Sequence, residues 1–302
     1  QYLIDENSPL AERYGNKVPS DEEAVVIAKR MAAAHALAEG RDVVVVASAR
    51  ALLRTLAPVG EEVFLPISLA AGSELSDMPG AQRAGVTEFE DLAQALVDRG
   101  YANTGELDGP GTFCVRGGTV DVFPGNLVYP VRLDFFGDEL DEIRRIVPTT
   151  GQTIQALPSV DIYPVREHSC SVKALARARK KLEVPARTNA ALRDMLEKLD
   201  GGLRFEGSNA LLYDGLETLG DYLPPVALTV LIEPRSLFDD ASHLFEEAAA
   251  RAKGTSIPVE GLYCDPSRLS FGDNQRATYM SIMRVGGMVD DELPVKRVEV
   301  AG

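Results

Sequence analysis

In the first 110 residues of the chain, the pattern of hydrophobic and polar positions alternates between segments typical of helices and segments typical of strands. Residues 20–23 read Ser-Asp-Glu-Glu, a capping box with acidic residues in the first helical turn, and Gly40 supplies the matching stop signal. Residues 43–47 are apolar throughout, as in a strand buried on both faces of a parallel sheet. This alternation predicts an α/β fold. The expected elements are a helix over 20–38, strands over 43–47 and 64–69, a short helix over 48–56, a mobile loop over 72–84 and a helix over 87–100.

From Gly111 onward the hydrophobic period changes to two, which is typical of antiparallel strands. Turn sequences such as Pro-Gly-Asn and Gly-Asp separate the apolar runs. The pair Gly117-Gly118 suggests a β-bulge or a close backbone approach within the first strand. The pattern indicates a compact antiparallel β-rich domain inserted between α/β segments. Its expected strands cover residues 112–123, 129–136, 139–147, 153–156 and 160–163.

After residue 164 the helical period returns. Helices are expected over 170–182 and 188–200, the second one capped by Thr188. A buried strand over 228–232 and a helix over 239–253 then repeat the α/β pattern of the first part. We therefore predict an α/β domain that is split by a β-rich domain and a small, mostly helical domain. The expected boundaries are 1–77 for the first α/β part, 78–164 for the β-rich domain, 165–225 for the helical domain and 226–302 for the returning α/β part.

One strand of the β-rich region, residues 130–136 (PVRLDFF), raises a chemical question. Because side chains of a strand alternate between its faces, Arg132, Asp134 and Phe136 lie opposite the core face. The parity of the preceding strand adds Arg116 to them. Two arginines beside an exposed aromatic ring have the composition of a protein–protein hot spot. The pattern leaves an equal alternative open, in which the α/β domain buries Phe136 and Arg132 pairs with Asp134.

The charge of the chain argues against nucleic-acid binding. Its 302 residues carry a formal net charge of −15, and such a surface repels phosphates. The basic run from Lys173 to Lys181 is the feature that favours a DNA-binding helix. Because Glu183 and an acidic protein surround this run, a solvated helix face is the preferred interpretation.

No motif for catalysis or metal binding stands out. The three cysteines and three histidines are scattered without CxxC or HxxxH spacing, so no zinc site is expected, and reduced thiols fit a cytoplasmic protein. The motifs GxxxxGK[ST] and GxSxG are both absent, so we expect neither ATP hydrolysis nor a bound cofactor in this chain. The apolar runs are too short to cross a membrane. Because the chain begins with Gln1 rather than methionine, we expect a fragment of a longer protein.

At this point a family resemblance is visible. Residues 113–154, FCVRGGTVDVFPGNLVYPVRLDFFGDELDEIRRIVPTTGQTI, closely resemble a domain shared by the bacterial transcription-repair coupling factor (Mfd) and the excision-repair helicase UvrB. The runs VRGGxxDVFP and PVRxDFFGDE within them are long and specific. Residues 41–58 and 228–248 resemble the strands and helices that flank this domain. The resemblance covers most of the chain and is strongest over residues 87–165.

Two features of the sequence favour the coupling factor over UvrB. UvrB carries a tyrosine-rich hairpin before the position of Ser20, whereas residues 6–19 contain Tyr14 alone, and the helical segment over 165–225 diverges. The resemblance then implies the N-terminal module of a coupling factor, with a degenerate, helicase-like α/β domain. A UvrB fragment whose P-loop lies outside this sequence is the alternative.

The resemblance also implies a function and residues that carry it. In both families this β-rich domain recruits the damage-recognition ATPase UvrA. By motif position, Arg116, Arg132 and Phe136 would make that contact, with Arg144 and Arg145 at its rim. These first three are the residues that strand parity places on the outward face.

The remaining expectations concern the parent protein. The chain is expected to be a non-catalytic, monomeric adaptor that brings UvrA to RNA polymerase stalled at DNA lesions, in transcription-coupled nucleotide excision repair. RNA polymerase and DNA would be bound by other domains, and ATP and Mg²⁺ by motor domains. The resemblance further implies that a C-terminal domain masks the UvrA-binding surface.

Overall fold

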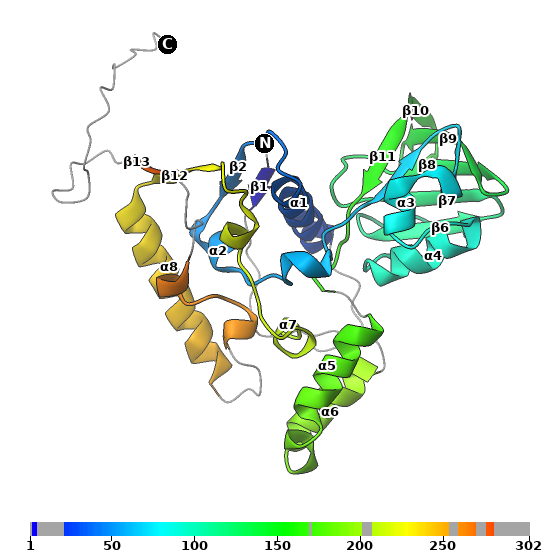
Figure 1. Ribbon diagram of the computed structural model, residues 1–302. Coiled ribbons are helices and arrows are strands. Elements are labelled where there is room, and N and C mark those ends of the chain that lie inside the picture. Colours follow the sequence, from blue (N-terminus) through cyan, green and yellow to red (C-terminus); the bar gives the residue numbers. More distant parts are fainter. Residues whose placement is uncertain are drawn as a thin grey trace, which may run out of the picture.

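The computed structural model describes residues 2–4, 21–168, 171–200, 207–253, 259–269 and 276–280, and has a mixed α/β fold (Figure 1). A long helix, α1 (Asp21–Ala38), lies at the centre. A β-rich part lies on one side of α1 and helix α8 (Pro234–Ala252) on the other. The helices α5 (Val172–Leu182) and α6 (Ala190–Asp200) pack together and project away from the rest.

The β-rich part is built on a seven-stranded sheet in the order β10-β9-β8-β7-β6-β5, with β4 also paired to β9. All neighbours are antiparallel except β5 and β6. The strands are β4 (Ser73–Glu74), β5 (Ala102–Asn103), β6 (Thr112–Arg116), β7 (Thr119–Phe123), β8 (Val131–Phe136), β9 (Glu139–Ile146) and β10 (Thr153–Leu157).

The predicted strand over 112–123 is wrong, because two strands occupy this segment. A tight turn at Gly117 and Gly118 reverses the chain between β6 and β7, and Gly117 has a φ of +62°, which suits glycine. The expected close approach is present at the second glycine. A Cβ on Gly118 would lie 2.8 Å from the carbonyl oxygen of Phe135.

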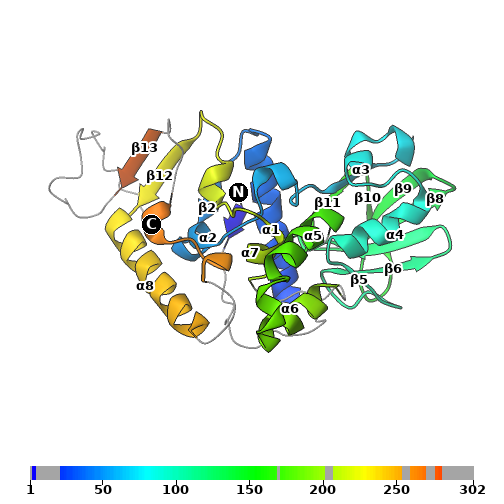
Figure 2. The same cartoon turned by 60° about the horizontal axis from the view of Figure 1, so that its bottom comes forward.

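A single large core joins α1 to the inner face of this sheet. Alanines along α1 let the helix come close to its neighbours, and apolar residues of β6–β9 complete the cluster. Helix α4 (Phe89–Asp98) packs beside the sheet, where Phe89 and Phe135 meet edge to face with ring centroids 5.1 Å apart. Figure 2 shows α4 lying alongside the strands.

Several predicted boundaries are confirmed. Helix α1 ends near Gly40, whose φ of +62° continues no helix. Ser48 caps the short helix α2 (Ala49–Leu53) by accepting from the Ala51 N–H. A capping box also opens α4, one residue later than the Thr87-to-Glu90 run that the sequence suggests, with Glu88 as the cap and Asp91 as its reciprocal partner. Helix α6 differs, because Asn189 rather than Thr188 accepts hydrogen bonds from its first free N–H groups.

The mobile loop predicted over 72–84 is also wrong. This segment holds β4, a 3₁₀ turn (Leu75–Asp77) and the short helix α3 (Pro79–Arg83). Leu75, Met78 and Ala81 insert into the core, and this burial outweighs the small and polar composition that suggested a loop.

The strands of the α/β part are less covered than their apolar sequences suggested. The strand β1 (Tyr2–Ile4) pairs in parallel with β2 (Val45–Ala47), and β12 (Leu228–Ile232) with β13 (Arg276–Met280). Val46, Leu228 and Ile232 are exposed, so the prediction of fully buried strands is wrong for the residues that the structure describes. Each of these strands has one hydrogen-bonded neighbour in that part of the chain.

The remaining strands and helices lie outside the seven-stranded sheet. The strand β3 (Ile67–Ala70) pairs with β11 (Ser159–Ile162), and the short helix α7 (Asn209–Leu212) packs on α5. Helix α8 begins five residues earlier than the sequence predicts, at Pro234, a residue that suits the first helical turn. Among the described helices, none has the length and apolar character required to cross a membrane.

Candidate protein-interaction surface

The side of the sheet opposite the core carries two rows of mainly polar side chains that run across β6, β7, β8 and β9. Cross-strand partners in an antiparallel sheet lie on the same face, so the register alone defines these rows. We call them, together with the facing pair at the turn between β8 and β9, the outer face. Its residues are Cys114, Asp121, Arg132 and Arg144 in one row, Arg116, Thr119, Asp134 and Glu142 in the other, and Phe136 and Glu139 at the turn.

Arg132 forms a two-pronged ion pair at the centre of the outer face. Its Nε donates to Oδ1 of Asp121 at 2.6 Å, and its Nη2 donates to Oδ2 at 2.7 Å. Asp121 is buried, while part of Arg132 reaches solvent. The hydrogen bonds that Arg132 donates to Asp121 raise the pKa of Arg132 above its ordinary value, so this guanidinium is fixed in both charge and orientation.

Arg116 lies beside this pair. Its Nη2 donates to the carbonyl oxygen of Gly105 at 2.9 Å, and its Nη1 is 3.9 Å from Oδ2 of Asp121. More than half of the Arg116 side chain is exposed. One buried carboxylate therefore serves two outward arginines, which brings both guanidinium groups to the same patch.

A second ion-pair network occupies the neighbouring row. Asp134 accepts a hydrogen bond from Thr119 Oγ1 at 2.9 Å and is ion-paired with Arg144. Glu142 lies 3.3 Å from the same guanidinium. The register sets Arg145 opposite Val131, an inner-face residue, so the two predicted rim arginines lie on opposite faces of the sheet.

Phe136 is the apolar member of the outer face, and 84% of it is exposed. The preceding ring, Phe135, faces inward and packs against Phe89, as strand alternation requires. The outward orientation predicted for Phe136 is therefore confirmed, and within the part of the chain that the structure describes no neighbouring domain buries it. Arg132 pairs with Asp121 rather than with Asp134. The roles of Arg116, Arg132 and Phe136 in binding stay a prediction.

Asp121 was missed by the reasoning from sequence. The segment 112–123 was read as one strand, so no register between its two halves was available. A signal is nevertheless present, since an acidic residue flanked by Val120 and Val122 in a strand must face away from the core.

The described residues give little support to a metal site or to a catalytic site. They hold no group of three or more His, Cys, Asp or Glu side chains that is placed to bind a metal ion. Cys114 lies buried on the outer face, and burial raises the pKa of its thiol, which lowers its reactivity. Cys170 lies outside the described residues. Glu167, which precedes the loop residue His168, is buried in an ion-pair network and is not available as an acid or base at a surface.

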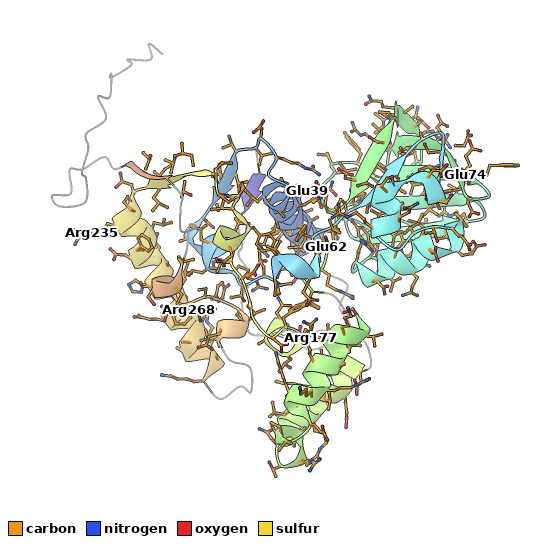
Figure 3. All side chains as sticks on the ribbon, in the orientation of Figure 1. Glu39, Glu62, Glu74, Arg177, Arg235 and Arg268 are labelled. Carbon is orange, nitrogen blue, oxygen red and sulfur yellow. The ribbon has the colours of Figure 1, made fainter. Side chains whose placement is uncertain are left out.

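The basic helix considered for DNA binding is α5. Three of its cations form hydrogen bonds or ion pairs with other parts of the protein. Arg177 donates two hydrogen bonds to Glu61, at the place where α5 meets the central part of the molecule (Figure 3). Arg179 pairs with Asp200, and Lys181 donates to the carbonyl oxygens of Ala210 and Tyr213. These contacts hold α5 against its neighbours and engage three of the five cations of the run, while Lys173 and Lys180 are exposed.

Comparisons with known proteins address the same region. Residues 82–168, which include the whole outer face, match the family described as the UvrB interaction domain. A transcription-repair-coupling factor from Myxococcus xanthus is 32% identical over 290 residues, which is 90% of this chain and 23% of that protein. The coupling factor of Bacillus subtilis is 26% identical over 81% of the chain and 21% of its own length.

UvrB proteins match a shorter stretch. The UvrABC system protein B of Synechococcus elongatus is 32% identical over 158 residues, or 52% of this chain and 22% of that protein. The chain thus spans about a quarter or less of the length of the curated relatives it matches. It contains a UvrB interaction domain and is homologous to the N-terminal part of transcription-repair coupling factors and to UvrB.

Proposed function

We propose that this chain is a non-catalytic adaptor that recruits UvrA through the outer face of its seven-stranded sheet. The observation that carries the proposal is the combination of a nearly fully exposed Phe136 with two arginines that one buried carboxylate holds in place. An exposed aromatic ring is costly to leave in water and gains most when a partner buries it. A UvrB interaction domain in this region is consistent with a protein partner.

The geometry suggests different roles for the aromatic residue and the two arginines in the interface. Phe136 is the anchor, because it protrudes at the turn between β8 and β9 and has the largest apolar area to bury. Arg116 and Arg132 are donors for carboxylates of the partner, and their own ion pairs fix them before binding, which lowers the entropic cost. The outer face carries four acidic and three basic residues, so local hydrogen bonding rather than a net positive charge would recognise UvrA.

The wider context of the adaptor is also part of this proposal. The parent protein would be a coupling factor that carries UvrA to RNA polymerase stalled at DNA lesions, with polymerase, DNA, ATP and Mg²⁺ bound by its other domains. A C-terminal domain of the parent would mask the outer face until the protein engages polymerase. We propose a monomeric, cytoplasmic protein, and the chain itself needs no cofactor for recruitment.

A fragment of the UvrB helicase is the second candidate. The extent of similarity favours the coupling factor, since a coupling factor aligns with 90% of the chain and a UvrB protein with 52%. Both candidates would use the same interaction domain for UvrA, so the recruitment proposal does not depend on the choice between them.

We expect that Arg132→Ala weakens UvrA binding about thirtyfold, as loss of a central interface residue typically costs about 2 kcal/mol. Arg132→Lys should restore little of this affinity, because an ammonium group keeps the charge but cannot form the two-pronged contact. Titration of purified UvrA with each variant measures the effect. Circular dichroism checks the fold, since Asp121 loses its main partner in the alanine variant.

Arg179→Ala is the matched control for this titration. Arg179 is an exposed, ion-paired arginine on α5, away from the outer face, and its loss should leave the affinity unchanged. Wild-type affinity in Arg132→Ala would show that UvrA binds elsewhere on the chain, and wild-type affinity in Arg132→Lys would reduce the role of Arg132 to its charge.

A further inference from the structure

The guanidinium of Arg132 has two edges, and Asp121 occupies one of them. The edge formed by Nε and Nη2 donates to the two oxygens of Asp121. The other edge, formed by Nη1 and the second N–H of Nη2, points away from this pair. A guanidinium carries five N–H donors in a fixed fork, so three remain after the pair with Asp121 is made. A carboxylate of a partner can therefore reach Arg132 only at its outer edge.

The outer edge of Arg132 is bordered by Gly151, in the turn between β9 and β10. A Cβ built on Gly151 would lie 3.5 Å from Nη2 and 3.9 Å from Nη1. No other atom of Arg132 would be within 4 Å of this Cβ, including the central Cζ. If the Cβ lay above the plane of the guanidinium, its distance to Cζ would be nearly the same as its distances to Nη1 and Nη2. The Cβ position therefore lies beyond the outer edge, on the path along which a carboxylate approaches.

We propose that Gly151 is a specificity-determining residue of the interaction surface, because its missing side chain keeps the outer edge of Arg132 open to a carboxylate of the partner. This inference rests on the proposed recruitment of UvrA through the outer face. A carboxylate oxygen must come within about 2.9 Å of Nη1 or Nη2 to accept a charge-assisted hydrogen bond. A Cβ at position 151 occupies that approach and makes only ordinary van der Waals contact with Arg132.

Backbone geometry offers a second reason for a glycine at this position, and the experiment must separate the two. Gly151 has a φ of +66°, in the left-handed region that most residues avoid. Its N–H donates to the Val147 carbonyl oxygen at 2.8 Å and closes the turn. Asparagine tolerates this backbone region best among residues with a side chain. Gly151→Asn therefore adds a side chain at the lowest cost to the turn.

Gly85→Asn is the matched control. Gly85 also has a positive φ, of +80°, and a Cβ there would have no atom within 4 Å. It follows α3 and is not part of the outer face, so the variant carries the backbone cost of asparagine without covering any arginine. The two variants should have similar unfolding midpoints, and only Gly151→Asn should affect recognition.

The experiment is a titration of UvrA with the wild-type chain, Gly151→Asn, Gly85→Asn and Arg132→Ala. We expect Gly151→Asn to weaken binding by about tenfold or more, the usual consequence of losing hydrogen bonds to a charged group. Gly85→Asn should bind as the wild type does. If Gly151→Asn binds as tightly as the wild type while Arg132→Ala does not, the inference about Gly151 is wrong and the proposed function stands.

A second readout needs no partner. Phenylglyoxal reacts with the terminal nitrogens of arginine, and peptide mass spectrometry reports the rate at Arg132 separately. We expect Gly151→Asn to slow this modification several-fold relative to Gly85→Asn, and equal rates would contradict the proposed cover. If the wild-type chain fails to bind UvrA, the proposed function is wrong, and the recognition role of Gly151 is overturned with it even where labelling is slowed.

Discussion

Replacing Glu167 by alanine is expected to lower the free energy of unfolding by about 3–5 kcal/mol, the largest effect predicted for any single charge in the chain. Glu167 is ion-paired with Arg30 of α1 and, at 2.9 Å, with Arg54, which follows α2. Arg30 is 1% exposed and Glu167 is 6% exposed. Without the carboxylate, two largely buried arginines lose the anion that they share, and breaking a buried ion pair by removing one partner is costly. Urea denaturation of the two proteins measures the difference.

An exposed ion pair provides the comparison for this prediction. Arg179 and Asp200 form a pair of which both members are well exposed, so Asp200→Ala should change stability by no more than about 1 kcal/mol. If Glu167→Ala and Asp200→Ala had equally small effects, the buried network would contribute nothing to holding α1 and α2 to the segment that leaves the β-rich part.

Gly125→Ala is expected to destabilise the protein by about 3 kcal/mol, the upper end of the cost of overpacking a tight interior. Gly125 lies in the loop between β7 and β8, where this loop meets α1. A Cβ there would lie 2.4 Å from the Ala24 carbonyl oxygen and 2.9 Å from the Cβ of Ala28. The backbone of α1 cannot move aside as the end of a flexible side chain can. The loop and α1 must therefore move apart. Thermal unfolding followed by circular dichroism measures the loss.

Gly60→Ala is the control for Gly125→Ala. A Cβ on Gly60 has no atom within 4 Å, and its φ is not in the left-handed region. Replacing glycine by alanine at such a site reduces the entropy of the unfolded chain and stabilises by about 0.4–1 kcal/mol. The two variants should therefore shift the unfolding midpoint in opposite directions, and a neutral Gly125→Ala would contradict the close packing of α1 on the β-rich part.

Much of the outer face could be predicted from the sequence because a strand has a period of two. Val131, Leu133 and Phe135 must share a face, and this fixes where Arg132 and Phe136 point. Two helix ends were predictable for a similar reason, since Ser48 and Gly40 act through contacts with their own immediate neighbours.

Features that depend on pairing between distant residues could not be predicted in this way. The partner of Arg132 is set by the register of β7 and β8, which depends on how the loop between Phe123 and Val131 folds. The pattern also did not separate the turn at Gly117 from a bulge, so β7 itself was not recognised as a strand of its own. The exposure of Val46 depends on which elements lie beside β2 rather than on its own sequence. The position of Gly151 beside the outer edge of Arg132 likewise follows from how the turn between β9 and β10 folds back.

The most direct test of the account is a titration of UvrA with Phe136→Ala beside Val128→Ala. These two apolar side chains of the β-rich part are almost equally exposed, at 84% and 83%, so both truncations should leave stability nearly unchanged. We predict that Phe136→Ala weakens binding about thirtyfold or more, as expected for the loss of a central aromatic anchor. Val128→Ala should bind as the wild type does. Wild-type affinity in Phe136→Ala, or an equal loss in both variants, would contradict the proposal that this phenylalanine is the anchor for UvrA.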